Sequence, residues 1–465
     1  MGHLFISAAH KSSGKTTLSI GLCAAFRQRG LNVQPFKKGP DYIDPMWLSR
    51  AAGQACFNLD FHTQDHDEIL CTFGQHQQGK DISILEGNKG LYDGLDLDGS
   101  NSNAALATLL GSPVILVIDA QGMTRGIAPL ILGYQAFEPD INIAGVILNQ
   151  LGGSRHESKL RAVIEHYTDV PVVGAVHRDP VLNIQERHLG LIPSNEAEAV
   201  EKQIDNVAEL VAKQVDLERL QSIANTAPVP NFQSPEKITL PPTDIRIGIA
   251  QDAAFGFYYQ DDLQAFRNAG AELISIDTLH DENLPEIDGL FIGGGFPETQ
   301  MQALEANTSL RKSIHNAVEA DLPVYAECGG LMYLSRSLDW NEKHCQMVGA
   351  LNMDIQMHQR PQGRGYVKLE ETGKSLWGES PSADDKQTII NAHEFHYSAP
   401  VESDSGKLAN NTQFAYRVLR GHGVDGKSDG IVYRNLLANY SHMRNVKNNP
   451  WVERFVGFVR KQRSK

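Results

Sequence analysis

The sequence has 465 residues, of which 41% are hydrophobic and 21% are charged, and this length favours two domains of about 200 residues over a single core. The formal net charge of −14 argues against a general nucleic-acid binder, which would carry a basic surface. Five cysteines without metal-type spacing favour a reducing, cytoplasmic setting over a disulfide framework. We expect neither a signal peptide nor a membrane span, because no apolar run is long enough to cross a bilayer.

The first half of the chain alternates short apolar runs with amphipathic stretches, which is the pattern of a parallel sheet covered by helices. A helical segment at 196–225 closes this pattern, and the proline-rich stretch 226–243 is typical of a linker. We therefore expect a first α/β domain over residues 1–225. Its expected strands are 4–8, 32–36, 82–85, 114–118, 143–148 and 172–176, and its expected helices include 16–29 and 103–110.

A second α/β alternation begins at residue 245 and predicts another domain over residues 244–465. After residue 345 the pattern becomes richer in strands and turns. The expected elements before that point are strands at 245–250, 272–276, 289–292 and 322–326, and helices at 260–269, 300–320 and 330–337.

A phosphate-binding loop is predicted where the first strand, Leu4–Ala8, runs into a helix. The run Gly14-Lys15-Thr16-Thr17 is the core of a Walker A loop, in which backbone N–H groups hold phosphates, the lysine reaches the outer phosphates and the first threonine can hold Mg²⁺. Ala9 stands where the usual first glycine would be. A chance match at a helix start is the alternative, but the strand before the loop and the helix after it favour ATP binding.

Three polar residues follow later strands of the same domain. Glu86 and Asp119 come directly after apolar runs, as does Asn149. Acidic residues at the carboxyl ends of parallel strands face the ligand crevice, so Glu86 and Asp119 are, with Thr16, the candidate Mg²⁺ ligands. Asn149 is a candidate to hydrogen-bond the adenine edge of ATP. Each acid taken alone is as typical of a helix cap as of a ligand.

A polar cluster follows the strand expected at 32–36. It pairs Lys37 and Lys38 with Asp41 and Asp44 around a Gly-Pro turn. A solvated polar loop is one interpretation. Its position at the carboxyl edge of a neighbouring strand favours a loop that binds the acceptor substrate.

In the second half, Cys328 follows an apolar run and precedes two glycines and a new apolar stretch. This strand–turn–helix pattern presents the thiol at the carboxyl end of a sheet and aims a helix N-terminus at it, which favours a thiolate. A buried structural cysteine is the common alternative, but the flanking glycines favour a nucleophile. Backbone N–H groups for an oxyanion hole would come from Gly294 and Gly295 of a triple-glycine turn and from Gly329.

A base must complete this site. Spacing alone does not choose among the downstream histidines, because the base in such a site is adjacent in space rather than in sequence. A histidine on a strand is also more often a core or surface residue than a catalyst. The available residues are His344, His358, His393, His396, His422 and His442.

Ordered motifs extend over nearly the whole chain. They are Gly14-Lys-Thr-Thr, Gly39-Pro-Asp-Tyr-Ile-Asp-Pro, Glu86-Gly with Gly90-Leu-Tyr-Asp-Gly, Val146-Ile-Leu-Asn, Arg187-His-Leu-Gly-Leu, Asp252-Ala-Ala-Phe, Gly293-Gly-Gly-Phe-Pro-Glu, Tyr325-Ala-Glu-Cys-Gly-Gly-Leu-Met-Tyr-Leu and His393-Glu-Phe-His-Tyr-Ser. Together they resemble the glutamine-hydrolysing cobyrinic and hydrogenobyrinic acid a,c-diamide synthases. The resemblance implies a dethiobiotin-synthetase-like P-loop domain with a parallel sheet, followed by a class I glutamine amidotransferase-like α/β domain.

The resemblance also implies an enzyme, an amide-forming ligase. Cys328 would attack the side-chain amide of glutamine and release ammonia through a thioester. The Ala438-Asn-Tyr-Ser-His stretch matches the family segment with the catalytic histidine, which makes His442 the base. Class I amidotransferases carry a glutamate two residues beyond that histidine. Because Arg444 stands there, a Cys–His dyad is expected.

The ATP half would phosphorylate a carboxylate of a tetrapyrrole, and ammonia would convert the acyl phosphate to an amide. The resemblance therefore implies ATP, Mg²⁺ and glutamine, and a homodimer is one expected assembly. The candidates for meeting the acceptor are the cations Lys37, Lys38, Lys89 and Arg125 and the loop residues Asp41, Tyr42 and Asp44.

Departures from the family pattern gather at the acceptor face. Lys38, Asn88-Lys89 and Gly99-Ser-Asn-Ser-Asn replace commoner residues. They leave open which tetrapyrrole is amidated. The leading hypothesis is cobyrinate or hydrogenobyrinate, amidated on the a and c acetates in cobalamin biosynthesis, and the alternative is sirohaem. A non-catalytic partitioning-type ATPase switch would use the P-loop but leave Cys328 and His442 without a role.

Overall fold

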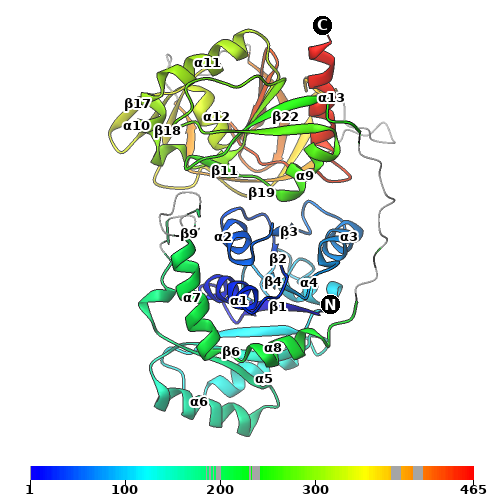
Figure 1. Cartoon of the computed structure of the whole chain (residues 1–465), viewed down its shortest axis with the longest axis vertical. Coiled ribbons are helices and arrows are strands. Elements are labelled where there is room, and N and C mark those ends of the chain that lie inside the picture. Colours follow the sequence, from blue (N-terminus) through cyan, green and yellow to red (C-terminus); the bar gives the residue numbers. More distant parts are fainter. Residues whose placement is uncertain are drawn as a thin grey trace. The chain divides into compact units, whose positions relative to one another are not determined.

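The computed structural model describes residues 2–184, 186–187, 190–191, 193–194, 200–229, 232, 241–378, 389–401 and 412–464. The chain divides into two compact units, residues 1–236 and 237–465, each built of strands and helices (Figure 1). The division falls within the stretch expected as a linker, of which residues 230–231 and 233–240 lie outside the described part. Residues 188–189 of the expected arginine motif also lie outside it.

Seven parallel strands form the sheet of the first unit: β1 (Gly2–Ala8), β2 (Val33–Lys38), β3 (Phe57–Leu59), β4 (Ile82–Glu86), β5 (Val114–Asp119), β6 (Ile143–Leu151) and β7 (Val172–His177). Their order is β3-β2-β4-β1-β5-β6-β7. The order reverses around β1, and ligands bind at the carboxyl ends of strands at such a reversal. In register, Ile6 pairs with Glu86 and Ala8 pairs with Val117.

Helices cover both faces of this sheet, since every residue of β1 is buried. Side chains from the strands, such as Phe5 and Leu116, share one core with Ile69 and Phe73 of the third helix. The helices are α1 (Lys15–Gln28), α2 (Ile43–Ala52), α3 (His66–Gln77), α4 (Asn103–Leu110), α5 (Ile127–Phe137), α6 (Ser154–Tyr167), the 3-10 helix η1 (Pro180–Leu182), α7 (Val200–Gln214) and α8 (Leu217–Ala224), and a ribbon is formed by β8 (Glu186–Arg187) and β9 (Gly190–Leu191).

Strand β2 continues beyond the end expected from the sequence, to Lys38. Lys37 and Lys38 are therefore part of a buried strand, with 2% and 5% of their surfaces exposed, and the expectation that they lie in a loop is wrong. Their charges hid the strand, because lysine is depleted in strands. Strand β3 was not predicted, since three residues are too few to show a period.

Nine strands form the main sheet of the second unit: β10 (Ile245–Ala250), β12 (Ala271–Ile276), β13 (Gly289–Ile292), β15 (Val324–Glu327), β19 (Gly363–Glu371), β20 (Ile389–His396), β22 (Gln413–Arg420), β23 (Ser428–Tyr433) and β24 (Leu436–Asn439). Their order is β12-β10-β13-β15-β24-β23-β22-β19-β20. The first five are parallel, and the rest pair antiparallel. Strand β15 is therefore central, and its last residue, Glu327, pairs with Asn439 of β24.

Smaller elements surround this sheet. The two minor sheets consist of β11 (Phe255–Phe257) with β14 (Gly294–Gly295), and of β17 (Lys343–Gln346), β16 (Ser335–Trp340), β18 (Leu351–Met357) and β21 (Ser398–Pro400). The helices are α9 (Gln260–Asn268), the 3-10 helix η2 (Pro297–Thr299), α10 (Met301–Ala306), α11 (Thr308–Glu319), α12 (Gly329–Leu334) and α13 (Trp451–Arg463).

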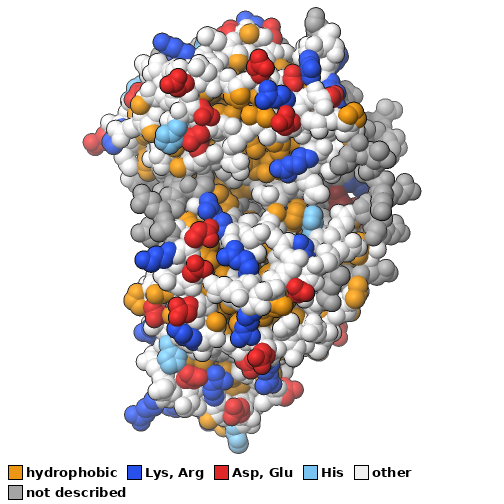
Figure 2. Space-filling view, in the orientation of Figure 1, with side chains coloured by type: hydrophobic (Ala, Val, Ile, Leu, Met, Phe, Trp, Pro, Cys, Tyr) orange, Lys and Arg blue, Asp and Glu red, His pale blue; other side chains and the backbone are white. Residues whose placement is uncertain are grey.

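Charged side chains of both signs are interspersed over the face of each unit that Figure 2 shows. The net charge of −14 is therefore not gathered into a single acidic field on that face. Among the described residues, no helix has both the length and the apolar character needed to cross a membrane.

Candidate active sites

Cys328 occupies the sharp turn between β15 and α12, so the predicted strand–turn–helix pattern is confirmed. Its backbone adopts φ 47° and ψ −102°, a conformation that costs a residue with a side chain about 1–3 kcal/mol. The Cys328 N–H donates to the carbonyl oxygen of Asn439 at 2.8 Å, which holds the turn. A Cβ on Gly330 would collide with the carbonyl oxygen of Ile292, so only glycine lets the new helix start this close to β13.

Two glycine segments approach each other beside the thiol. Gly294 and Gly295 form β14, and a Cβ on Gly295 would collide with the carbonyl of Ala254. A Cβ on Gly329 would lie 3.0 Å from the backbone nitrogen of Gly295. Backbone N–H groups from both segments are thus close to Cys328, which is the arrangement an oxyanion hole requires.

His442 is the histidine that the fold brings to Cys328. It is 3% exposed, and its backbone N–H donates to the carbonyl oxygen of His393 at 2.7 Å. The rings of His393 and His442 stack with centroids 4.9 Å apart. Burial alone would lower the pKa of His442, but its hydrogen bond with Cys328 and the charges of Cys328 and Glu327 raise that pKa to about 10. The ring of His442 is therefore protonated at neutral pH.

A carboxylate that was not predicted as a site residue lies beside this pair. Oε2 of Glu327 lies 3.5 Å from Nδ1 of His442, and both side chains are 3% exposed. Arg444 instead pairs with Asp261, to which its Nε and Nη2 donate at 2.9 and 2.6 Å. A third ionisable side chain therefore lies beside the expected pair of Cys328 and His442. The signal was available, because Glu327 ends a central parallel strand just as Glu86 does.

The P-loop of the first unit connects β1 and α1. Gly14 has φ 86°, and a Cβ there would collide with the side-chain amide of Asn149. Nδ2 of Asn149 donates to the carbonyl oxygen of Ser13 at 2.9 Å, so this amide holds the loop, and its Oδ1 is buried without a hydrogen-bond partner among the described residues. No side chain in the described part of the chain caps α1, which leaves N–H groups of its first turn to receive phosphate.

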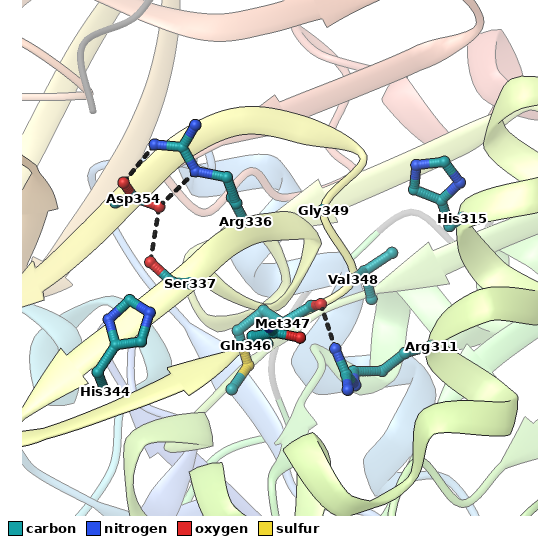
Figure 3. A pocket seen from close by; sticks show the side chains of 10 residues that line it. All are labelled: Arg311, His315, Arg336, Ser337, His344, Gln346, Met347, Val348, Gly349 and Asp354. Carbon is teal, nitrogen blue, oxygen red and sulfur yellow. Dashed lines mark hydrogen bonds and ion pairs between the residues drawn. The ribbon is translucent and has the colours of Figure 1, made fainter. Parts of the chain in front are cut away.

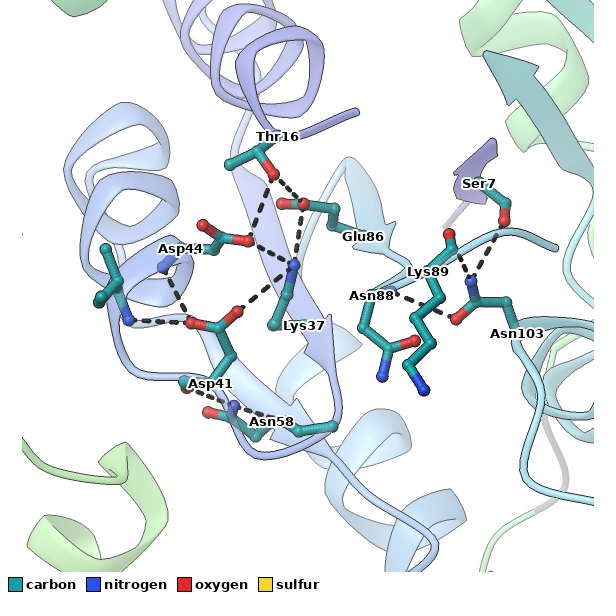
Figure 4. Close-up of polar contacts among 12 residues, drawn as sticks. Ser7, Thr16, Lys37, Asp41, Asp44, Asn58, Glu86, Asn88, Lys89 and Asn103 are labelled. Atoms are coloured by element: carbon teal, nitrogen blue, oxygen red, sulfur yellow. Dashed lines mark hydrogen bonds and ion pairs between the residues drawn. The ribbon is translucent and has the colours of Figure 1, made fainter. Parts of the chain in front are cut away.

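Four side chains converge in front of α1 (Figure 4). Oγ1 of Thr16 donates to Glu86 at 2.6 Å and to Asp44 at 3.3 Å. Nζ of Lys37 donates to Asp44 at 2.5 Å and to Glu86 at 2.9 Å. Burial opposes the charge of Lys37, but the neighbouring carboxylates raise its pKa well above the ordinary value. Burial, and after it the charge of Lys37, lower the pKa of Lys15, while the charges of Glu86, Asp44 and Asp93 oppose that shift.

This cluster fits a Mg²⁺ ion. Two carboxylates and a hydroxyl supply hard oxygen ligands, and Oε2 of Glu86 is buried without a hydrogen-bond partner among the described residues. The described residues contain no group of three His, Cys, Asp or Glu side chains suited to a metal, so phosphate oxygens and water would complete the shell. Asp119, the other acidic candidate, accepts a hydrogen bond from the Gln121 N–H at 2.9 Å. Asp44, expected at the acceptor, lies beside Thr16 and Lys37.

Comparison with known proteins identifies the family. The model of the CobQ/CobB/MinD/ParA nucleotide-binding domain matches residues 5–192, and that of the CobB/CobQ-like glutamine amidotransferase domain matches residues 246–450. A cobyrinate a,c-diamide synthase of Magnetococcus marinus is 44% identical over 99% of this chain and 98% of its own length. The chain belongs to the cobyrinate a,c-diamide synthase family. Synthases of Archaeoglobus fulgidus and Methanosarcina acetivorans are 40% and 39% identical over 97% and 95% of the chain, and over 96% and 92% of their own lengths.

Membership in the cobyrinate a,c-diamide synthase family confirms three predictions from the sequence: the family, the α/β fold of a P-loop domain followed by an amidotransferase domain, and an amide-forming ligase. The two matched regions contain the two sites described above. The P-loop cluster lies within residues 5–192, and Cys328 with His442 lies within residues 246–450.

The remaining acceptor candidates of this synthase-family chain occupy varied environments. Burial lowers the pKa of Lys38 to about 8, and its Nζ donates to the carbonyl oxygen of Asn101 at 2.6 Å. Oδ1 of Asp41 accepts from backbone N–H groups at the start of α2, while Tyr42 is 8% exposed. The exposed candidates are Lys89, in the loop after β4, and Arg125, whose guanidinium lies 5.0 Å from the ring centroid of Tyr167.

The second unit also has a pocket of about 510 Å³, and Figure 3 shows the side chains that line it. Its lining includes Arg311 and Arg336 but neither Cys328 nor His442. Arg336 donates to Asp354, and Arg311 donates to a backbone carbonyl, so both guanidinium groups already have protein partners. The reactive thiol, and not this pocket, is the candidate glutamine site.

Proposed function

We propose that this chain uses ATP and glutamine to amidate the a and c acetate carboxylates of cobyrinate or hydrogenobyrinate in cobalamin biosynthesis. The observation that carries the proposal is the hydrogen-bonded pair of Cys328 and His442, held on a strained turn in a chain that matches cobyrinate a,c-diamide synthases over its whole length. Thiolate nucleophiles of this kind act by covalent catalysis.

In the second unit, the Cys328 sulfur attacks the side-chain carbonyl carbon of glutamine. The oxyanion that forms accepts hydrogen bonds from the backbone N–H groups of Gly295 and Gly329. The carbon–nitrogen bond then breaks, His442 gives its proton to the departing ammonia, and a thioester remains. Water cleaves the thioester to glutamate, giving its proton to His442 and restoring the thiolate.

In the first unit, an acetate oxygen of the tetrapyrrole attacks the γ-phosphorus of ATP, and ADP leaves. Lys15 and the first-turn N–H groups of α1 bind the phosphates, and Thr16, Asp44 and Glu86 are the residues that would hold Mg²⁺. The ion supplies neutralisation of the phosphate charge. Ammonia then attacks the acyl phosphate, whose carbon–oxygen bond breaks to release phosphate and leave the amide.

The test is mass spectrometry of products formed from cobyrinate, hydrogenobyrinate and sirohaem with ATP, Mg²⁺ and glutamine. We expect mass changes of one and two amidations on the first or second acceptor. If only sirohaem were amidated, the proposed acceptor would be wrong and the proposed reaction would still hold. Hydrolysis of ATP without any amide product would favour the partitioning-type switch.

The variant Cys328→Ala separates the two half-reactions. Its glutamine-dependent synthesis should fall by roughly 10³-fold or more, because the nucleophile is lost. Synthesis from ammonium salts should persist, since the P-loop unit is unchanged. Full glutamine-dependent activity in this variant would contradict the nucleophile, and failure of ammonia to rescue it would contradict the two-site scheme.

A further inference from the structure

Glu327 is a buried carboxylate next to the proposed thiolate–imidazolium pair. It is 2% exposed, and a charge at such a depth is costly unless hydrogen bonds and an opposite charge compensate for it. Both kinds of compensation are present. Oε1 accepts hydrogen bonds from the Tyr325 hydroxyl at 2.6 Å and the Met443 backbone N–H at 2.8 Å, and Oε2 faces Nδ1 of His442 at 3.5 Å.

The two carboxylate oxygens of Glu327 contact different groups. Oε1 holds the backbone directly after His442 through Met443, and Oε2 faces the ring itself. An imidazole nitrogen that faces a carboxylate carries a proton, so Nδ1 stays protonated in both states of the ring and Nε2 is the nitrogen that exchanges its proton. Tyr325 lies in the same strand and fixes the carboxylate from the opposite side, in an aromatic cluster with Phe291 and Trp451.

We propose that Glu327 is the positioning residue of the glutaminase site, which orients the His442 ring toward Cys328 and stabilises its protonated form. The inference rests on the proposed glutaminase function. Class I amidotransferases carry a glutamate two residues after the histidine, where this chain has Arg444. Glu327 supplies a carboxylate in its place, from the strand that precedes Cys328 rather than from the segment that contains His442.

The other groups around His442 do not supply this charge. His393 stacks on its ring from β20, and the Tyr259 hydroxyl lies 3.3 Å from Nδ1 of His393. Arg444 follows on the same segment, and its guanidinium is paired with Asp261. Among the contacts described for the ring of His442, Glu327 is therefore the anion, besides the thiolate itself.

The test is the variant Glu327→Gln in the full-length chain. Glutamine keeps an oxygen that can accept from Tyr325 and Met443, but it removes the charge. We expect kcat for glutamine hydrolysis to fall about 10²-fold, with KM changed by less than about threefold. The basic limb of the pH–rate profile should move to lower pH from its position near pH 10, because loss of a neighbouring anion lowers the pKa of His442.

Two further variants make the result specific. Glu327→Asp keeps the charge on a shorter side chain, so its pH profile should stay near that of the unmodified protein while kcat falls less than in Glu327→Gln. Glu371→Gln is the matched control, since Glu371 is a buried carboxylate of the same unit that pairs with Arg454. Glu371→Gln should change neither the basic limb of the pH–rate profile nor kcat for glutamine hydrolysis. Urea unfolding of each variant, followed by tryptophan fluorescence, verifies that the second unit is folded, because synthesis from ammonium salts reports only on the first unit.

The inference is overturned if Glu327→Gln keeps kcat within about twofold, or loses it without any shift of the basic limb. Failure of the inference remains distinct from failure of the proposed function. If the unmodified protein hydrolyses glutamine and Cys328→Ala does not, the function stands whatever Glu327→Gln does. If the unmodified protein hydrolyses no glutamine, the function fails as well.

Discussion

At the residue scale, both reactive centres are built at the end of a central parallel strand. Glu86 ends β4 and Glu327 ends β15, with 0% and 2% of their surfaces exposed. Each acidic group meets a cation that another element supplies, Lys37 in the first unit and His442 in the second. Because strand ends converge at one edge of a sheet, a single residue there can organise partners that are far apart in the sequence.

The proposed metal site gives a prediction for Asp44. Asp44→Asn removes one of two anionic oxygens that meet Thr16, so the Mg²⁺ concentration for half-maximal activity should rise about tenfold or more. The measurement is ammonia-dependent amide formation against Mg²⁺ concentration. Asp119→Asn is the control and should leave the curve in place. If Asp44→Asn changed only the KM for the tetrapyrrole, the original expectation of an acceptor residue would stand.

At the element scale, the connection from β15 to α12 decides the geometry of the thiol. A strand whose residues are all buried leads into it, Cys328 takes a strained backbone conformation, and glycines let α12 begin against β13 and β14. Backbone strain of this kind persists only where the surrounding structure over-determines it. Here the hydrogen bond from Cys328 to Asn439 and the close packing of Gly330 provide that restraint.

This connection gives a prediction for stability. Gly330→Ala should lower the free energy of unfolding of the second unit by about 1–3 kcal/mol, because its methyl group meets the carbonyl of Ile292. Gly457→Ala, at an exposed position in α13 with no atom within 4 Å of the new Cβ, should raise it by about 0.5–1 kcal/mol. Urea unfolding followed by tryptophan fluorescence measures both. Equal effects of the two substitutions would contradict the close packing.

Two helices of the second unit end at residues that the spacing of apolar residues did not predict. The helix expected at 300–320 is divided into α10 and α11, since the side chain of Asn307 accepts the Leu310 N–H and starts a new helix. The helix expected at 330–337 ends at Leu334, and Ser335 begins β16. In both places a polar residue, Asn307 or Ser335, ends the helix although the helical spacing of apolar residues continues. Helix α13 was not predicted.

At the scale of the whole molecule, the two units have separate cores and separate sites. Residues such as Phe5 and Leu116 belong to a core within the first unit, while Leu290 and Val324 belong to one within the second. Each reactive cluster is assembled within one unit. A ligand of one site should therefore stabilise chiefly the unit that binds it.

Hydrogen exchange tests this separation. ATP with Mg²⁺ at about 100 times its Kd should stabilise the first unit by about 2.7 kcal/mol against opening. Added protection is expected mainly in residues 2–184, with little change around Cys328. Lys15→Met should abolish the effect, because the lysine that meets the phosphates is lost. Equal protection of both units, or protection that survives Lys15→Met, would contradict the assignment of ATP to the P-loop.

The sequence by itself determined the two α/β halves, the P-loop motif and the family, and it indicated Cys328 as the candidate nucleophile, because each depends on residues that are adjacent along the chain. Gly14 to Thr17 and Cys328 to Gly330 are recognisable from such local order. The family resemblance had already indicated His442 among the six histidines, but only the tertiary structure placed Glu327 rather than Arg444 beside it and Asp44 beside Thr16. These choices depend on strand order and register, which bring together side chains that no spacing in the sequence relates.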